Sequence, residues 1–418
     1  MDLDISKKIL MVASLVSALS FGSKAKANDF LYIGSEVKGS AGSGITQSRS
    51  SSALEYNPAN LIYTKKVSLR FDISSFNLVH NFVPNDPELQ STNLGIKATP
   101  FSLGLVYKYR GFAMGASFVP TGGGGREFVL NQQTDFGVMP MRIQKEQSSY
   151  RVSAGLAKRI NKKLALGLSV QNLSESTATK VFLADDSFPI LSSDEAIIDS
   201  SENGRFTRFI VGLKLNINRK WKLNFVYKNN LEKNYQGQVY NFMEGEDFQE
   251  TNKKSFLPSE YGLGSEIRLG KFSLFNEIKY LAYSEGRAIE NNGIGQEEGA
   301  EVDLQDVVEL SLGVKAKLIK DTKFSLAVAY LPNYMGDGSV ANEDATEPPV
   351  IGPGIGDFKA IDRSILAVGA AHRLNSSVKL LSSLNYVSGT RVVSDEFANP
   401  GTYDVSIWEF SLGTIYNF

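Results

Sequence analysis

The sequence predicts an all-β protein, a transmembrane antiparallel β-barrel of about fourteen strands. Three observations predict this fold. Runs of nine or more residues alternate between apolar and polar side chains from Val67 onward. Tight turns and long polar loops alternate between these runs. After residue 27 no apolar run approaches the roughly 20 residues of a spanning helix, so only strands could cross a membrane.

The first 27 residues have the pattern of a secretory signal peptide. Lys7 and Lys8 precede an apolar run, and "AKA" ends just before Asn28, where we expect cleavage. The alternative is a membrane anchor, but the run is too short to span a bilayer. Residues 28–66 follow, and their small polar side chains and glycines offer little apolar surface for a core of their own.

The first strand is predicted in "KKVSLRFDI". Alternation places four apolar side chains on one face and three polar ones on the other, namely Val67, Leu69, Phe71 and Ile73 against Ser68, Arg70 and Asp72. A soluble β-sandwich also alternates, but its strands are shorter, whereas these runs are about long enough to cross a bilayer at a tilt. Only a closed barrel pairs every backbone group in lipid.

The connections indicate how many strands there are. The tight ones are mostly basic and lie near Arg110, Asn161, Asn218, Gly270, Lys320 and Asn375. The long ones are acidic or rich in glycine and proline, as in "GGGGREFVLNQQTDFG" and "ENNGIGQEEGAEVDLQ". About seven long loops and about six tight turns require about fourteen strands, with both ends of the barrel chain on the tight-turn side.

The last run, "DVSIWEFSLGTIYNF", places five large apolar side chains on one face: Trp408, Phe410, Leu412, Tyr416 and the terminal Phe418. A chain that ends in an aromatic residue on an apolar face resembles the terminal strand of bacterial outer-membrane barrels. The resemblance implies that Phe418 belongs to the signal that the barrel assembly machinery reads.

Composition narrows the chemistry. The expected cleavage removes four positive and two negative charges and takes the formal net charge from -1 to -3, so nucleic acid is not an expected partner. The chain has no cysteine, which excludes disulfides and thiolate metal sites. His80 and His372 lie in no nucleophile or metal-binding pattern. We therefore expect no enzymatic activity, no metal and no cofactor.

Four motifs resemble the FadL family of outer-membrane transporters for long-chain fatty acids and related hydrophobic molecules. They are Asn57-Pro58-Ala59 after a Ser/Ala-rich segment, Pro120 before glycines in "SFVPTGGGG", Leu257-Pro258 in "FLPSEYGLGSEI", and the closing "GTYDVSIWEFSLGTIYNF". Their order and spacing extend the resemblance over nearly the whole mature chain. Each motif is weak by itself, and the combination is specific.

The resemblance implies three parts: a signal peptide at residues 1–27, an N-terminal plug or hatch at 28–66 inside the lumen, and the transmembrane barrel at 67–418. Asn57, Pro58 and Ala59 are then expected to shape and gate the hatch, since proline fixes the path of the chain into the first strand. The Asn57 amide is expected to pair with backbone at a kink in the third strand. From these residues alone, an ordinary Asn-Pro turn is the alternative.

The resemblance also implies passive transport through the outer membrane of a Gram-negative bacterium by a monomer that contacts outer-membrane lipids. A hydrophobic small molecule, such as a fatty acid or hydrocarbon, would be captured by the extracellular loops and leave sideways through the wall. Pro120 and Gly122 are expected at the strand kink that forms this lateral opening. A general aqueous porin is the alternative, followed by a barrel adhesin or enzyme.

Candidate ligand contacts follow from position and chemistry. Apolar clusters in the long loops suit an entry groove, with Phe128, Leu130, Phe188 and Leu191 as the candidates. Packing of the loops on each other is the alternative. Arg151 and Arg208 point inward by alternation and could meet a carboxylate. Alternatively, each could pair with an interior acid such as Glu266, Glu309 or Glu409.

Overall fold

The computed structural model of the 418-residue chain describes residues 32–84, 92–134, 137–183, 198–241, 249–285, 288–290, 300–302, 305–333, 361–393 and 401–418. The expected signal peptide, residues 1–27, lies outside the described residues. No helix in the part of the chain that is described is long and apolar enough to cross a membrane.

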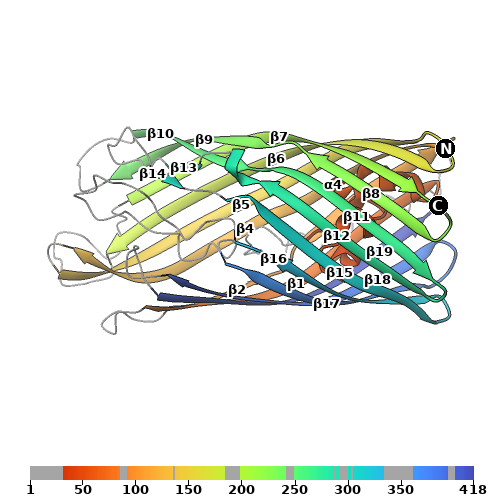
Figure 1. Ribbon diagram of the computed structural model, residues 1–418. Helices are drawn as coiled ribbons and strands as arrows, with labels where there is room; N and C mark the ends of the chain where they lie inside the picture. The colour runs from red at the N-terminus through yellow and green to blue at the C-terminus, as the bar shows by residue number, and fades with distance from the viewer. Residues whose placement is uncertain are drawn as a thin grey trace.

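One antiparallel sheet forms the wall of the molecule (Figure 1). In chain order its segments are β1 (Val67–Pro84), β2 (Thr92–Ala98), β3 (Phe101–Tyr109), β4 (Phe112–Thr134), β5 (Gly137–Arg159), β6 (Leu164–Leu183), β7 (Ile198–Asn216), β8 (Trp221–Lys228), β9 (Leu231–Asn241), β10 (Gln249–Leu257), β11 (Ser259–Leu269), β12 (Phe272–Ala282), β15 (Val307–Ile319), β16 (Thr322–Leu331), β17 (Arg363–Arg373), β18 (Val378–Val393) and β19 (Gly401–Asn417). The turn η4 (Tyr283–Glu285) and a small separate hairpin of β13 (Ala288–Glu290) and β14 (Ala300–Val302) follow β12.

These 17 described segments make up the predicted closed barrel of fourteen strands. Three wall strands are each interrupted, so that β2 with β3, β8 with β9 and β10 with β11 count as one strand each. The sheet closes where β1 pairs with β19, from Ser68 opposite Asn417 to Pro84 opposite Gly401. At the end of this ladder the backbone N–H of Phe418 donates to the carbonyl of Val67 at 3.1 Å.

The tight turns lie at one end of the barrel, together with the C-terminus (Figure 1). Three of them share one construction, since the side-chain oxygens of Asn161, Asn218 and Asn375 each accept two backbone N–H groups at 2.8–2.9 Å. The turn at Arg110 and Gly111 uses left-handed backbone, with φ of 42° and 88°.

The outer face of the barrel is apolar. On β12 the side chains of Phe272, Leu274, Ile278 and Tyr280 are 39–49% exposed, while Phe275 between them is buried toward the lumen. Exposed aromatic side chains form two belts. The turn-side belt contains Tyr109, Phe112, Trp221 and Phe272, and the loop-side belt contains Tyr150, Tyr227, Tyr261, Tyr280 and Trp408. Such belts mark the two interfaces of a bilayer.

One expected loop is strand instead. The segment "GGGGREFVLNQQTDFG" belongs almost entirely to the β4–β5 hairpin, whose ladder continues from Gly122 opposite Ser149 to Thr134 opposite Gly137. Glycines and polar residues are depleted in strands, so the composition predicted a loop. Here β4 and β5 pair with each other through their backbones, and this pairing stabilises the strand conformation. Phe128 and Leu130 therefore lie on a strand.

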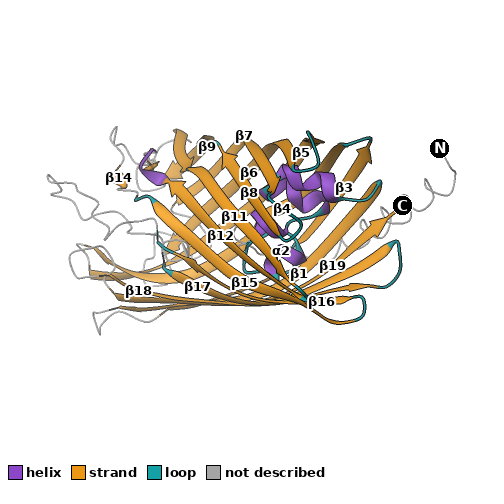
Figure 2. Cartoon of the chain, turned by 45° about the vertical axis from the view of Figure 1, so that its right-hand side comes forward, coloured by secondary structure: helices purple, strands orange, loops and turns teal. Residues whose placement is uncertain are grey.

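The segment before β1 lies inside the barrel, in the half nearer the tight turns (Figure 2). It consists of five short helical turns: α2 (Ser35–Lys38), α3 (Gly44–Gln47), η1 (Ser50–Ser52), α4 (Ala53–Tyr56) and η2 (Pro58–Tyr63). Nearly all of its described side chains are buried. We call residues 32–66 the hatch, which is the described part of the segment expected at 28–66.

A closed hydrogen-bonded barrel should resist detergent until it is heated, because its backbone pairs are all internal. We expect an unboiled sample to migrate anomalously on a denaturing gel and to shift to its normal position after boiling. Circular dichroism of the detergent-extracted protein should show predominantly β-structure. A water-soluble, helix-rich mature protein would refute the barrel.

Candidate functional site

The inner wall leaves room for the hatch by placing glycines opposite it. A Cβ built on Gly167 of β6 would lie 2.3 Å from the backbone nitrogen of Ala59, and one on Gly212 of β7 would lie 2.1 Å from the side-chain oxygen of Asn57. Other wall glycines also meet hatch atoms within 3 Å by this measure: Gly104, Gly155, Gly262, Gly264, Gly369 and Gly413. These glycines come from many strands, so the hatch touches the wall on several sides.

The serines of the hatch hydrogen-bond to the wall. The Ser50 hydroxyl is 3.0 Å from that of Ser68 on β1, and the Ser43 hydroxyl is 2.9 Å from that of Ser311 on β15. The small polar residues of the segment thus find partners on the lumen wall, beside an apolar cluster in which Leu54, Leu61 and Ile62 pack against the wall.

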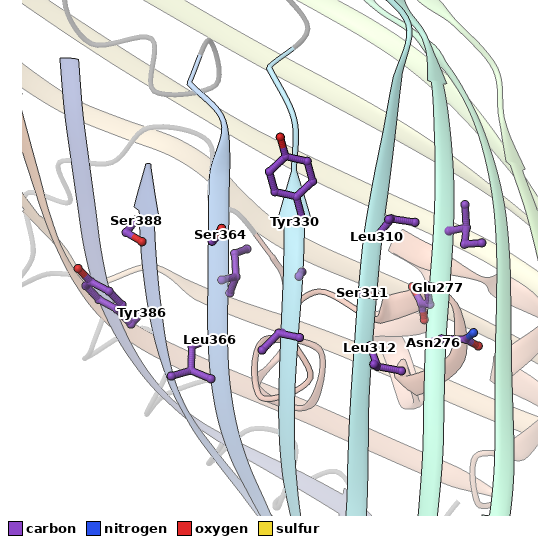
Figure 3. Close-up of a pocket in the computed structure, with 14 residues that line it drawn as sticks. Asn276, Glu277, Leu310, Ser311, Leu312, Tyr330, Ser364, Leu366, Tyr386 and Ser388 are labelled. Carbon is purple, nitrogen blue, oxygen red and sulfur yellow. The ribbon is translucent and has the colours of Figure 1, made fainter. Parts of the chain in front are cut away.

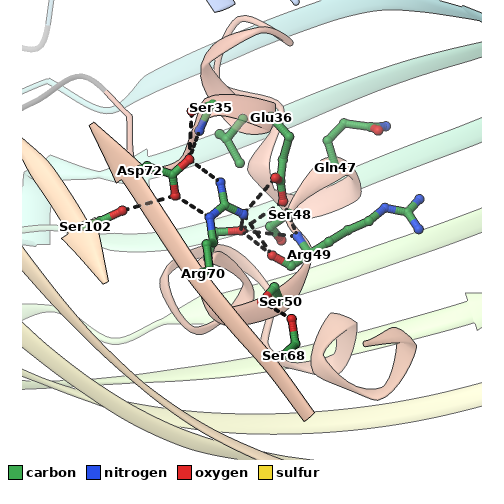
Figure 4. Close-up of polar contacts among 12 residues, drawn as sticks. Ser35, Glu36, Gln47, Ser48, Arg49, Ser50, Ser68, Arg70, Asp72 and Ser102 are labelled. Atoms are coloured by element: carbon green, nitrogen blue, oxygen red, sulfur yellow. Dashed lines mark hydrogen bonds and ion pairs between the residues drawn. The ribbon is translucent and has the colours of Figure 1, made fainter. Parts of the chain in front are cut away.

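Buried ion pairs join the hatch to β1 (Figure 4). Arg70 lies 2% exposed on the inner face of β1 and contacts Glu36 of α2 at 2.7 Å and Asp72 on its own strand. Asp72 also accepts from the backbone N–H of Ser35 at 2.9 Å. Every charge in this group is matched by an opposite charge or a hydrogen-bond donor, as burial requires.

Two more wall carboxylates hold the hatch on other sides. Glu409 of β19 pairs with Lys38, whose ammonium group also donates to Ser74 at 2.6 Å. Glu277 of β12 accepts from the backbone N–H and the hydroxyl of Thr46 at 2.6 and 2.7 Å. All of these groups are buried, so the hatch and the wall supply each other's hydrogen-bond partners.

Glu55 of α4 connects the hatch to β4, β5 and β6. Its carboxylate accepts from Ser117 at 3.0 Å, Ser153 at 2.6 Å and Gln171 at 2.8 Å, and it pairs with Arg151 at 3.0 Å. One candidate head-group ligand is thus bound to a hatch acid, an interior acid that the sequence did not single out.

Asn57-Pro58-Ala59 lies against β6 and β7. The Asn57 side-chain oxygen accepts from the N–H of Ala59 at 3.1 Å, and its amide donates to the carbonyls of Ile45 and Leu213 at 3.4 Å each. The expected contact with a kink in the third strand is wrong, because Leu213 is on β7. Gly167 and Gly212 create the space there, and neither was a sequence candidate.

The wall changes at Pro120. In the β4–β5 ladder Pro120 lies opposite Tyr150 and Gly122 opposite Ser149, so Thr121 is an extra residue in a bulge. On its other side β4 pairs with β3 only up to Phe118 opposite Leu103.

Beyond that point β2 pairs with β1 alone, and no ladder between β2 and β4 occurs among the described residues. We call this unpaired stretch the seam. Its outer margin carries a row of ring contacts from Phe71 through Phe101 and Phe118 to Tyr150, with centroids 5.9–6.5 Å apart.

The lumen on the loop side of the hatch is apolar over part of its circumference. Phe76 and Leu78 of β1, Val405 and Ile407 of β19 and Val387 of β18 are buried in one cluster with Tyr32 of the hatch. Facing strands carry ion pairs instead, including Lys228 with Glu260 at 2.9 Å and Lys279 with Glu309 at 3.3 Å. This region of the lumen therefore has an apolar side and a charged side.

A depression of about 600 Å³ lies elsewhere, on the outside of β12 and β15–β18 (Figure 3). Its lining includes the outward side chains of Leu310, Leu312, Tyr330 and Leu366, which are 44–58% exposed. It belongs to the apolar outer surface, so it is separate from the lumen.

The other candidates are placed as follows. The Arg208 guanidinium donates to the carbonyls of Asn229 at 2.9 Å and Pro258 at 2.6 Å, where the strands β8–β9 and β10–β11 are interrupted. Phe188 and Leu191 lie outside the described residues. Phe418 packs edge-on against Tyr416 at 4.6 Å between ring centroids. No group of three or more metal-binding side chains occurs among the described residues.

A larger side chain at Gly167 should displace the hatch, because its Cβ would collide with backbone atoms of Pro58 and Ala59. We expect Gly167→Val to form a heat-modifiable barrel with raised steady conductance in planar bilayers. Ala154→Val, on the exposed outer face of β5, is the matched control and should conduct as little as the unaltered protein. Equal conductance of the two variants would contradict the close seating of the hatch.

Comparison with known proteins supports the architecture. No protein-family model and no curated protein matches the chain. Solved structures do: a Pseudomonas aeruginosa FadL homologue aligns at a TM-score of 0.69 and 15% identity over 94% of this chain and 100% of its own. The Pseudomonas putida toluene transporter TodX aligns at 0.66 and 12% over 94% and 100%. The Ralstonia pickettii toluene transporter TbuX aligns at 0.55 and 11% over 93% and 98%. The chain therefore has the barrel fold of these three proteins.

Proposed function

We propose that the protein is an outer-membrane channel through which hydrophobic small molecules, fatty acids or hydrocarbons, diffuse and leave sideways through the barrel wall. The fold is shared with a FadL homologue and with two toluene transporters. Movement is passive, since binding and release need only the concentration gradient of the ligand.

The observation that carries this proposal is the seam. Within a membrane a barrel wall ordinarily pairs every backbone group, so an interruption needs a reason. Here the ladder between β3 and β4 ends at Phe118, just before the bulge at Pro120 and Gly122. Phe118 and Tyr150 give the outer margin of the seam an aromatic surface that a hydrocarbon can cross.

The apolar side of the lumen supplies the route to the seam. A ligand captured by the long loops descends onto the cluster around Leu78, Val405 and Ile407. Each methylene that leaves water contributes about 0.8 kcal/mol. The hatch lies on the tight-turn side of this cluster, where its buried side chains fill the path through the lumen. A ligand is therefore directed to the wall.

An acidic ligand would add an electrostatic step at Arg151. The Arg151 side chain is 22% exposed while that of its partner Glu55 is 1% exposed, so a carboxylate can approach Arg151 from the lumen. Such a carboxylate would compete with Glu55 and loosen α4 next to Ser117 of β4. Arg208 binds backbone carbonyls and is the weaker candidate for this role.

The hatch also favours this proposal over an aqueous porin. A porin requires an open lumen, and the buried hatch of residues 32–66 occupies it. The alternative that the barrel is an enzyme would need a catalytic residue such as His372. Its ring nitrogen Nδ1 lies 2.8 Å from the Thr322 hydroxyl, a structural contact that needs no catalytic role.

Changing Asn57-Pro58-Ala59 should slow uptake without unfolding the barrel, since no wall ladder includes these residues. Asn57→Ala removes hydrogen bonds to Ile45 and Leu213, and Pro58→Ala frees φ. We expect uptake of labelled oleate or toluene by cells to fall severalfold at unchanged surface levels. The control Asn172→Ala lies on the outer face of β6. Uptake equal to this control in both variants would leave the tripeptide as an ordinary turn.

Closing the seam is the sharper test. The chain has no cysteine, so a pair introduced at Ser102 and Val119, the first position beyond the last β3–β4 pair, can be linked selectively. We expect Ser102→Cys/Val119→Cys treated with a short bifunctional thiol reagent to lose most hydrocarbon uptake, because the strands can no longer separate.

The matched control is Leu105→Cys/Ala116→Cys, which links a pair already held in the ladder. Its uptake should be unaffected by the same reagent. Full uptake by the linked seam variant would show that ligands leave by another route.

A further inference from the structure

The tight turns carry a feature that transport does not use. Together they form what we call the basic rim: residues 109–112, 159–164, 217–221, 268–272, 317–323 and 372–378. Asp321 is its sole acidic residue, whereas each of the six turns contains lysine or arginine. We propose that the basic rim binds the headgroups of anionic phospholipids in the leaflet at this end of the barrel.

The rim pairs its cations with exposed apolar side chains. Ile160, Leu269, Leu318 and Leu374 are 48–65% exposed at the turns. Each has a cation beside it in the sequence: Arg159, Arg268, Lys317 and Arg373 respectively. Apolar groups that enter the acyl region and cations that remain at the phosphates are the pattern of an interfacial anchor.

Ring contacts place the cations at the membrane interface. Arg110 of the rim lies over the ring of Tyr109 at 5.1 Å, and Lys158, the residue just before the rim segment 159–164, lies over the ring of Phe112 at 5.0 Å. Both rings belong to the turn-side aromatic belt, so these charges lie where that belt meets water. Lipid phosphates occupy the same level.

Ion pairs neutralise only a small part of the positive charge of the rim, as where Arg268 lies 3.5 Å from Glu266. Among the described residues, no ion pair involves Arg110, Lys162, Arg219, Lys220 or Lys271. A ring of unneutralised cations around the barrel at headgroup height matches a ring of lipids, whereas a soluble acidic protein would meet one sector of it.

The two tryptophans of the chain allow a local test, because Trp221 is in the basic rim and Trp408 is in the loop-side belt on β19. Trp408→Phe leaves Trp221 as the sole indole, and Trp221→Phe leaves Trp408. Each full-length protein is reconstituted in phosphatidylcholine vesicles. Quenching by brominated phosphatidylglycerol is then compared with quenching by brominated phosphatidylcholine.

At Trp221 we expect phosphatidylglycerol to associate about fivefold more strongly, as one nearby cation provides, and this preference to weaken in high salt. At Trp408 we expect none. Arg219→Gln/Lys220→Gln should abolish the preference at Trp221. The matched control Lys180→Gln/Arg205→Gln removes two exposed cations from β6 and β7 outside the rim and should retain it.

Equal quenching of Trp221 by the two lipids would overturn the proposal. A preference that survives Arg219→Gln/Lys220→Gln, or one equally strong at Trp408, would overturn it as well. None of these outcomes depends on transport, so the result is independent of the proposed channel function.

Discussion

The pairing of β1 with β19 is the interaction on which the rest of the structure depends. It removes the two edges that the sheet would otherwise expose, and in lipid an unpaired edge costs several kcal/mol for each backbone group. Closure also creates an enclosed lumen with charged side chains buried on its inner face, among them Arg70, Asp72 and Glu409. Something must satisfy these groups, and much of that task falls to the hatch.

The hatch meets this demand with polar contacts. Ion pairs of Arg70 with Glu36 and of Lys38 with Glu409 join it to the wall, and removing one partner of such a buried pair costs about 3–5 kcal/mol. An apolar interface of the same size could be equally stable, but it would lack partners that a ligand or water can replace. Polar contacts therefore hold the hatch at specific positions on the wall.

Glycines on the inner wall allow close contact with the hatch, whereas the end of the β3–β4 ladder leaves the wall unpaired. Gly167 and Gly212 let the backbone of the hatch approach the wall closely, which seals that part of the lumen. The seam beyond Phe118 interrupts the backbone pairing of the wall at another place. Ser117, just before the seam, donates a hydrogen bond to Glu55 of the hatch. The same short segment, Glu55 to Ala59, thus contacts the glycines of β6 and β7 and, through Ser117, the last paired residues of β4 before the seam.

The sequence by itself determined the barrel, because lipid outside and polar groups inside impose a period of two that is readable in each strand, as in Val67 to Ile73. It also determined which connections are tight, since asparagines such as Asn161 form turns through their own side chains. Only the tertiary structure decided that Asn57 meets β7, that Arg151 pairs with Glu55, and that "GGGGREF" is strand. These contacts join residues about 100 or more positions apart or depend on a partner strand, and no local pattern records such a partner.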